Sequence, residues 1–193
     1  VLTDGRGTGV YGTVASVEGK DILEVAVERV RTEPEPEPSI TVVQALPKGD
    51  RGELAVETMT EVGVDVIIPW TAARCVARWR GERGAKSLAK WRNAAREAGK
   101  QARRLRFPVV TEPMSTHQVA ELVGGAAFAA VLHEEGDRPL AVHPLPERGT
   151  IVLVVGPEGG ITPEETAAFT AAGAVPLRLG PTVLRTSTAG VAA

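Results

Sequence analysis

The sequence predicts an α/β fold in which a parallel sheet is covered by helices and is preceded by a small β-rich segment. From residue 39 onward, short apolar strands alternate with helical patterns, which is typical of a parallel sheet covered on both faces. Residues 9–31 alternate apolar and polar side chains between glycine-rich turns, as strands do. Between these parts, residues 32–38 contain three prolines, which lack an amide donor and disfavour helix before them. We therefore expect a partial barrel and linker over residues 1–36 and the main domain over residues 37–193.

The elements of the main domain follow from apolar periodicity. Strands are predicted over residues 39–46, 64–70, 127–132, 151–155 and 175–179. Helices are predicted over residues 52–62, 86–106 and 115–123, from Thr162 onward, and again from Ser187 to the end of the chain. The first of these helices is expected to pack through one face that comprises Leu54, Ala55, Thr58, Met59 and Val62.

The composition narrows the class of protein. The formal charge is −2, yet residues 74–106 carry twelve of the 22 Lys and Arg residues and two acids. Cys75 is the only cysteine, which excludes a disulfide framework and a multi-cysteine metal site and favours a reducing cytoplasm. No apolar run approaches the roughly 20 residues that span a bilayer. Because Val1 is not an initiator methionine and the last helix has only begun, we expect missing segments at both ends.

The basic segment is predicted to form a two-faced helix. At 3.6 residues per turn, one stripe is apolar and comprises Leu88, Trp91, Ala95, Ala98, Ala102 and Leu105. The opposite side carries Lys86, Lys90, Arg96, Lys100, Arg103 and Arg104. Like charges on one helix face oppose its stability, and phosphate contacts would offset that cost. We predict RNA contact through these six residues, against the alternative of a merely solvated face.

A glycine-rich turn is the sharpest local signal. The apolar strand Ile151–Val155 runs into Gly156-Pro-Glu-Gly-Gly160 and then into a helix start, with Thr162 as the N-cap and Glu165 as its capping-box partner. Ligands favour such turns at the carboxyl ends of parallel strands, because glycines allow close approach of the backbone. The spacing is neither that of a dinucleotide fingerprint nor that of a phosphate-binding lysine loop.

A second strand-to-helix turn follows at Leu179-Gly180-Pro181 and leads to Arg185 at a helix start. The helix macrodipole disfavours a cation there, and such conflicts tend to mark functional positions. The alternative is a surface arginine that pairs with a nearby acid.

The two turns together resemble the carboxyl-terminal signature of the SPOUT RNA methyltransferases. Gly156-Pro-Glu-Gly-Gly160 is followed by Leu179-Gly-Pro-x-x-Leu-Arg185-Thr-x-Thr-Ala189, and upstream motifs such as Gln44-Ala-Leu-Pro-Lys-Gly-Asp50 agree in order and spacing. The resemblance implies a trefoil knot at the carboxyl end, a PUA-like barrel at the amino end and a homodimer that shares its RNA site between subunits. It also implies S-adenosylmethionine as the cofactor and uridine N3 of 16S ribosomal RNA in the small subunit as the target.

The same resemblance implies the site residues. The cofactor is expected on three loops, through Leu132, His133, Glu134, Gly156, Pro157, Gly159, Gly160, Leu179, Gly180, Val183, Leu184 and Thr188. Arg185 is expected to stabilise the uracil anion, because a guanidinium is always charged. Glu158 would orient cofactor or base, or would only cap its own turn. No general base and no metal site are predicted, and His133 is expected to be a neutral structural histidine.

Two alternatives remain open from the sequence. The same fold could act on another RNA, such as a transfer RNA or 23S ribosomal RNA. The chain could also be an RNA-binding ribosome-assembly factor that keeps the fold without catalysis.

Overall fold

The structure, a computed structural model, describes residues 1–193 and contains two sheets. The first is antiparallel and consists of β1 (Leu2–Thr3), β2 (Thr8–Glu18) and β3 (Ile22–Thr32). The second has seven parallel strands in the order β6-β5-β4-β9-β7-β10-β8. The α/β class and the parallel sheet are confirmed.

The bounds of the elements agree with most of the predictions. The strands of the large sheet are β4 (Ser39–Ala45), β5 (Val66–Trp70), β6 (Val109–Val110), β7 (Phe128–Leu132), β8 (Arg138–Pro139), β9 (Thr150–Val155) and β10 (Val175–Arg178). The helices are α1 (Arg51–Glu61), α2 (Gly81–Gln101), α3 (Thr116–Gly124), α4 (Pro163–Ala171) and α5 (Thr186–Ala192), with a 3₁₀ turn η1 (Leu140–Val142). No helix combines the length and the apolar character needed to cross a bilayer. The two-residue strands β1, β6 and β8 are too short to give a periodic signal, and the sequence did not predict them.

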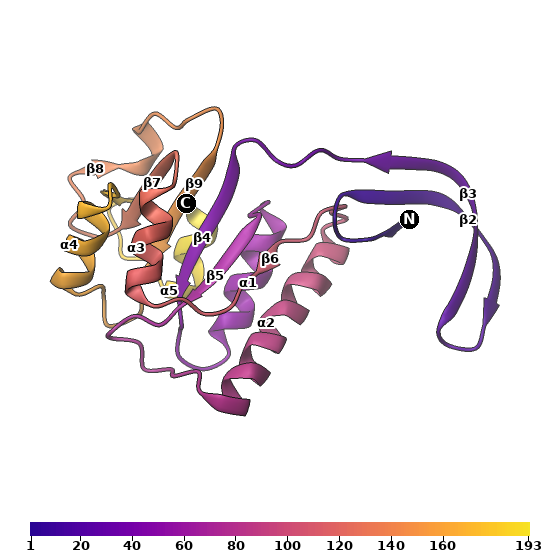
Figure 1. Cartoon of the computed structure of the whole chain (residues 1–193), viewed down its shortest axis with the longest axis horizontal. Helices are drawn as coiled ribbons and strands as arrows, with labels where there is room; N and C mark the ends of the chain where they lie inside the picture. Colours follow the sequence, from indigo (N-terminus) through magenta and orange to yellow (C-terminus); the bar gives the residue numbers. More distant parts are fainter.

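Helices cover both faces of the sheet (Figure 1). Helix α1 packs against α2 and α5, whereas α3 packs against α4 on the other side. The chain therefore moves outward from the middle of the sheet in two directions: β4, α1 and β5 lead one way, while β9, α4 and β10 lead the other. Strands β4 and β9 are neighbours, so the topological switch point of the sheet lies at their carboxyl ends. Ligands of open α/β sheets bind at such a point.

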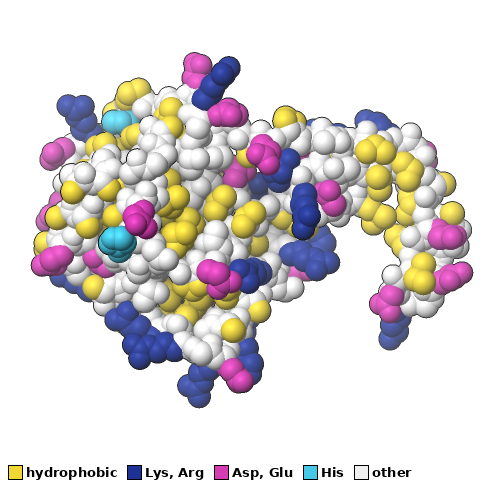
Figure 2. Space-filling model, viewed as in Figure 1, with side chains coloured by type: hydrophobic (Ala, Val, Ile, Leu, Met, Phe, Trp, Pro, Cys, Tyr) yellow, Lys and Arg dark blue, Asp and Glu magenta, His cyan; other side chains and the backbone are white.

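The amino-terminal sheet forms an arm that projects from the α/β body (Figure 1). Its long hairpin of β2 and β3 leaves large apolar side chains exposed, among them Val14, Val17, Val27 and Val30, and apolar patches are visible on the arm in Figure 2. The base of the arm is tied to the segment after α2, where the Gly7 amide donates to the Leu105 carbonyl and the Phe107 amide to the Gly5 carbonyl. The arm is thus held at two places along the chain, by the proline-rich linker and by this contact.

The predicted buried face of α1 is wrong in part. Ala55 and Met59 are buried as expected, but Leu54 is 46% exposed and Val62 is 59% exposed. The helix buries Gly52, Val56 and Thr60 instead. Gly52 explains the rotation, because a Cβ there would lie 2.4 Å from the indole nitrogen of Trp91. The contact with α2 therefore turns α1 by about one residue from its apolar stripe.

The predicted bounds of the basic helix, residues 86–106, are also wrong. Helix α2 begins at Gly81, because Gly84 lets the backbone of Trp79 approach to 2.8 Å from where a Cβ would stand. It ends before Arg103, which has a left-handed φ of 56°. The Arg104 amide donates to the Gly99 carbonyl and the Arg103 amide to the Lys100 carbonyl, the bonds of a Schellman motif. Leu88, Trp91, Ala95 and Ala98 are buried as predicted, whereas Leu105 is buried beyond the helix.

Some of the clustered cations bond to the protein itself. Arg104 was predicted to contact RNA, but its side chain is only 16% exposed and lies 3.6 Å from Asp65. Its Nη1 donates to the carbonyls of Thr60 and Val64 at 2.9 and 2.8 Å. Burial lowers the pKa of Arg104, against the opposing effect of Asp65. Arg104 is therefore a structural residue that joins the end of α2 to the turn between α1 and β5.

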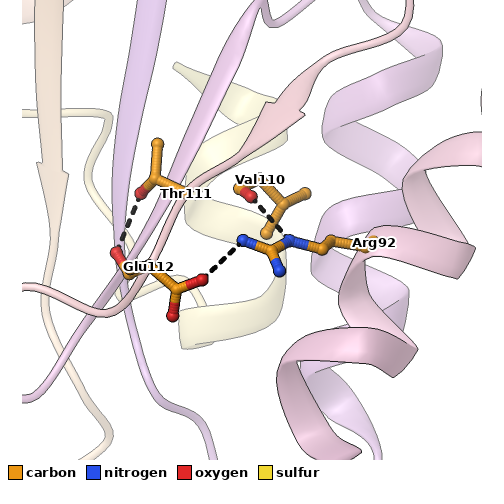
Figure 3. Close-up of polar contacts among 4 residues, drawn as sticks. All are labelled: Arg92, Val110, Thr111 and Glu112. Atoms are coloured by element: carbon orange, nitrogen blue, oxygen red, sulfur yellow. Dashed lines mark hydrogen bonds and ion pairs between the residues drawn. The ribbon is translucent and has the colours of Figure 1, made fainter. Parts of the chain in front are cut away.

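Arg92 is held in a similar way (Figure 3). Its Nε donates to the Val110 carbonyl at 3.1 Å, and its Nη2 lies 2.9 Å from Glu112. The Thr111 hydroxyl donates to the Glu112 carbonyl at 2.9 Å. Arg92 thus fastens α2 to β6 and the residues after it.

We expect Arg104→Ala to lower the free energy of unfolding by about 2 kcal/mol, because it removes a charged donor from the Thr60 and Val64 carbonyls and leaves the largely buried Asp65 carboxylate without its cation. Urea denaturation at pH 7 measures the change. Arg96→Ala is the matched control, since Arg96 is an exposed arginine of α2, and its effect should stay below about 0.5 kcal/mol. Equal stability of the two variants would contradict the structural role of Arg104.

Candidate functional site

Three loops meet at the carboxyl edge of the sheet around a cavity of about 530 Å³. They follow β7, β9 and β10, and the loop after β5 adds Arg74. The volume is in the range of sites for cofactors and drug-sized ligands. Gly159 and Gly180, which are far apart in the sequence, line the same cavity.

The cavity brings together nearly all of the predicted site residues. Those that line it are Leu132, His133, Glu134, Gly156, Pro157, Glu158, Gly159, Gly160, Leu179, Gly180, Val183, Leu184 and Arg185. Thr188 does not line it; its hydroxyl donates to the Arg185 carbonyl within the first turn of α5.

The glycine turn is shaped by local bonds. The Gly160 amide donates to the Pro157 carbonyl at 2.9 Å, and Gly160 has a φ of 74°, which favours glycine. The predicted capping box is present: the Thr162 side chain accepts from the Glu165 amide, and the Glu165 side chain accepts from the Thr162 amide. The turn therefore enters α4 in a defined direction.

Buried Glu165 also connects α4 to two other loops. Its Oε1 accepts from the Ala73 amide at 2.8 Å and from the Thr116 hydroxyl at 3.1 Å. Thr116 in turn accepts from the Trp70 indole at 3.2 Å. This network, with all its acceptors bonded, fixes the loop after β5 beside the glycine turn.

Several backbone amides along the cavity have no partner within the chain. They belong to Glu158, Gly159, Leu179, Gly180, Val183 and Leu184, none of which donates a backbone or side-chain-directed hydrogen bond. Free amide donors beside the apolar side chains of Leu132, Leu179 and Leu184 suit a flat ligand with polar edges.

Four arginines and two acids give the cavity its charge: Arg51, Arg74, Arg178, Arg185, Glu134 and Glu158. Arg185 is the N-cap residue of α5, and its side chain is exposed and makes no ion pair within the chain. The alternative of a surface arginine that answers an acid is therefore not what the structure has. A free guanidinium at the rim can stabilise negative charge on a bound group.

Glu158 does not cap its own turn. Its Oε1 accepts from the Lys48 amide at 3.2 Å, which joins the glycine turn to the loop after β4. His133 is fixed through its backbone, with its amide donating to the Leu177 carbonyl at 2.9 Å, and its Nδ1 accepts from the Glu135 amide at 3.2 Å. The His133 side chain is thus bonded within its own loop.

A second, shallower cavity of about 580 Å³ adjoins the first at the end of β4. Lys48, Gly49, Asp50, Arg51, Leu54 and Glu158 line it. Arg51 and Glu158 line both cavities. The two cavities thus lie on either side of the switch point between β4 and β9.

Sequence reasoning missed three arginines of the main cavity: Arg51, Arg74 and Arg178. Arg51 begins α1 after the loop that follows β4, Arg74 lies in the loop after β5, and Arg178 is the last residue of β10. Their positions after the carboxyl ends of parallel strands could have identified them as candidate site residues. Cys75, one residue from Arg74, is buried, and burial raises the pKa of its thiol.

The other two histidines lie outside the cavity. His117 faces Glu121 one turn along α3 at 3.7 Å, and His143 stacks on Phe128.

The basic face of α2 is partly available. Lys86, Lys90, Arg96 and Arg103 are exposed, while Lys100 pairs with Glu97 at 2.6 Å. Figure 2 shows Lys and Arg side chains gathered along the lower edge of the molecule, over the start of α2 and the loop before it. Such a face can contact phosphates.

Comparison with known proteins gives the class first. The family model of the RNA methyltransferase domain matches residues 33–193, so the doubly wound sheet and its cavity are those of an RNA methyltransferase domain. Ribosomal RNA small subunit methyltransferase E of Mycobacterium tuberculosis is 48% identical over 197 residues, which cover 100% of this chain and 75% of that protein. The chain belongs to the ribosomal RNA small subunit methyltransferase E family, and the family expected from the motifs is confirmed.

Solved structures agree. Ribosomal RNA small subunit methyltransferase E from Neisseria gonorrhoeae, bound to S-adenosyl methionine, has a TM-score of 0.85 at 28% identity and covers 99% of this chain and 78% of its own. A Legionella pneumophila protein solved with bound SAM has a TM-score of 0.87 at 29% identity, with coverage of 99% and 78%.

We expect Gly156→Ala to destabilise the protein by about 1–3 kcal/mol, because a Cβ there would lie 2.6 Å from the Ile161 side chain. Gly180→Ala is the matched variant, since no atom lies within 4 Å of its added Cβ, and its stability should be unchanged within about 0.5 kcal/mol. Thermal and urea unfolding measure both. A cavity shaped as described is contradicted if Gly180→Ala is the less stable of the two.

Proposed function

We propose that this chain binds S-adenosylmethionine in the cavity between the loops after β7, β9 and β10, and methylates N3 of a uridine in the 16S ribosomal RNA of the small subunit. The single observation that carries the proposal is the convergence of two glycine turns, with free amides, beside the unpaired guanidinium of Arg185. Membership of the family supports the reaction type and the RNA class. The N3 position rests on the motif resemblance.

The residues of the cavity fit this cofactor. Leu132, Leu179 and Leu184 offer apolar surface to a flat adenine, and the free amides of Leu179 and Gly180 offer donors to its ring nitrogens. The cofactor supplies an electrophilic methyl group on a sulfonium. Arg185, exposed where it lines the cavity, would lie beside a base that approached the cofactor there.

Arg185 is the proposed catalytic residue. N3 of uracil must give up its proton to solvent, and the resulting negative charge spreads to the neighbouring carbonyl oxygens. A guanidinium that already stands at the rim stabilises this charge without reorganisation. Glu158, which lines both cavities, is proposed to orient the base or the cofactor.

The second cavity is the proposed entrance for the target nucleotide. It adjoins the first at Arg51 and Glu158, which line both, and the acceptor base must come within reach of the methyl group. The exposed Leu54 offers an apolar surface, while Lys48 and Arg51 offer donors to carbonyl or phosphate oxygens.

The trefoil knot is part of the same proposal. Helix α4, before β10, packs on one face of the sheet, and α5, after β10, packs against α1 on the other face. The segment between β10 and α5 therefore crosses the carboxyl edge of the sheet between neighbouring loops. The loop after β7 lies tightly over β10, since a Cβ on Gly136 would be 2.6 Å from the Leu177 carbonyl carbon. We propose that the last segment threads this loop.

The arm and the rim support two further parts of the proposal. The long hairpin of β2 and β3, with its exposed valines, has no core of its own, which agrees with residues 1–36 as part of a PUA-like RNA-binding barrel ahead of a methyltransferase domain over 37–193. Val183, 75% exposed beside the cavity, agrees with a homodimer in which a second copy covers the rim. Action on ribosomal RNA would be consistent with a cytoplasmic location, which is part of the proposal.

Arg185→Ala should abolish methylation while the dissociation constant for S-adenosylmethionine stays within about tenfold of the wild type, or roughly 1.4 kcal/mol. Primer extension on 16S ribosomal RNA from a strain lacking the enzyme reports the first effect, because an N3-methylated uridine stops the polymerase. The wild-type gene should restore the stop and the variant should not. Calorimetry reports the second effect.

Other results would change the function. A stop that appears only in 23S or transfer RNA would reassign the substrate. Absence of any cofactor binding by the wild type would favour a binding protein without catalysis.

The triple variant Lys86→Ala, Lys90→Ala, Arg96→Ala should weaken RNA binding and lower the salt dependence of log K by about two to three units of slope, because each lost phosphate contact removes about 0.9. Binding titrations at several salt concentrations measure the slope. Arg148→Ala, an exposed arginine on the loop before β9, is the control and should leave the slope unchanged. An unchanged slope in the triple variant would remove α2 from the RNA interface.

A further inference from the structure

Arg74 reaches the glycine turn from a distant part of the sheet. It lies in the loop after β5, and β4 separates β5 from β9, the strand that leads into the turn. Its Nη1 donates to the Gly159 carbonyl at 3.0 Å. A Cβ on Gly159 would be 3.1 Å from the Cβ of Arg74, so the two backbones pack closely.

This bond acts on one peptide group. The carbonyl of the Gly159–Gly160 peptide accepts from Arg74, and the amide of the same peptide donates to Pro157 at 2.9 Å. Two successive glycines allow nearly free rotation of the peptide plane between them, since neither has a Cβ. With both ends bonded, the plane cannot turn without breaking two hydrogen bonds, one of which is charge-assisted.

The direction of this peptide decides what the turn presents to the cavity. In the observed direction, the amides of Glu158 and Gly159 have no partner in the chain. A rotated plane would release the Pro157 carbonyl and swing the Gly159 carbonyl away from Arg74. The Gly159 carbonyl, a hydrogen-bond acceptor, would then stand beside amides that otherwise offer only donors to the cavity.

Arg74 can hold this position because its own loop is fixed. The amide of Ala73 donates to buried Glu165 at 2.8 Å, one residue before the arginine. Glu165 also accepts from the Thr162 amide, just beyond the turn. The loop after β5 therefore holds the glycine turn at two places: its Ala73 amide bonds to Glu165 at the start of α4, and its Arg74 side chain bonds to the Gly159 carbonyl.

We infer that Arg74 is a positioning residue of the methyltransferase: it fixes the Gly159–Gly160 peptide and thereby keeps the turn's free amides directed at the cofactor. The inference rests on the proposed function for the identity of the ligand. The bond to the peptide does not depend on it, so the two can be tested separately.

The first measurement is hydrogen exchange of the Gly160 amide in the ligand-free protein, followed by NMR. We expect Arg74→Ala to speed this exchange about tenfold, while the Phe169 amide in α4 exchanges at the wild-type rate. Arg83→Ala is the control, because it removes an exposed arginine near the start of α2; it should change neither amide. Unchanged exchange at Gly160 in Arg74→Ala overturns the inference, whatever the protein binds.

The second measurement is binding and turnover with S-adenosylmethionine. Arg74→Ala should raise the dissociation constant and KM for the cofactor about tenfold, with kcat at saturation within about twofold. Arg74→Lys should recover part of the affinity, because one ammonium donor can still reach the Gly159 carbonyl. Equal affinity of Arg74→Ala and wild type overturns the inference and leaves the function standing.

Two further outcomes have distinct meanings. A raised dissociation constant with unchanged Gly160 exchange overturns the positioning role, because Arg74 would then contact the cofactor directly. If Gly160 exchanges faster in Arg74→Ala but the wild-type protein binds no S-adenosylmethionine, Arg74 does fix the Gly159–Gly160 peptide and the proposed function is wrong.

Discussion

The parallel register of four strands determines where everything else in this molecule can lie. Val155 of β9 is level with Gln44 of β4 on one side and with Leu132 of β7 on the other, and Leu132 is level with Leu177 of β10. The next residues of all four strands therefore emerge at one height on one edge. A slip of one residue in any pair would move a strand's side chains to the opposite face of the sheet, where they would have to repack against the other layer of helices.

Arginines and lysines have different roles in the basic segment, residues 74–106. Arg74, Arg78, Arg92, Arg104 and Arg106 all donate to backbone carbonyls at loops or chain ends. A planar guanidinium with several donors suits this task, since it can satisfy two carbonyls at once. The lysines make no such bonds; Lys100 pairs only with a neighbouring acid. Much of the positive charge that suggests RNA binding is therefore structural, and the cations that stay exposed without a partner in the chain are Arg80, Arg83, Lys86, Lys90, Arg96 and Arg103.

Local signals explain what the sequence could predict. The capping box of Thr162 and Glu165 and the strand before it involve neighbours in the chain, and both lie where expected. The start of α2 and the buried face of α1 depend instead on Gly84 beside Trp79 and Gly52 beside Trp91. Close contacts between separate elements override the apolar period, so no pattern within one helix could reveal them.

The residues of the site also fall into those predicted from local motifs and those that only the tertiary structure brings in. The loops after β7, β9 and β10 were predicted because their motifs are recognisable. Arg51 and Arg74 carry no motif and reach the cavity only because β4 and β5 end at the same edge of the sheet. Glu165 had a local role as the capping partner of Thr162, but its bonds to Ala73 and Thr116 join segments more than 45 residues away. A residue's local role was thus predictable, whereas its second role required the tertiary structure.

The loop between β5 and α2 links the basic face to the cavity mechanically. Arg78 donates back to the carbonyls of Ala72 and Ala73, which stiffens the loop, and Trp79 packs edge-on against Trp91 of α2. From this loop, Arg74 holds the Gly159 carbonyl. A displacement of α2 would act on the loop through the Trp79 contact, and the loop has few ways to absorb it without moving Arg74. A ligand that displaced α2 would therefore act on the glycine turn, and by thermodynamic reciprocity a ligand of the cavity would act on α2.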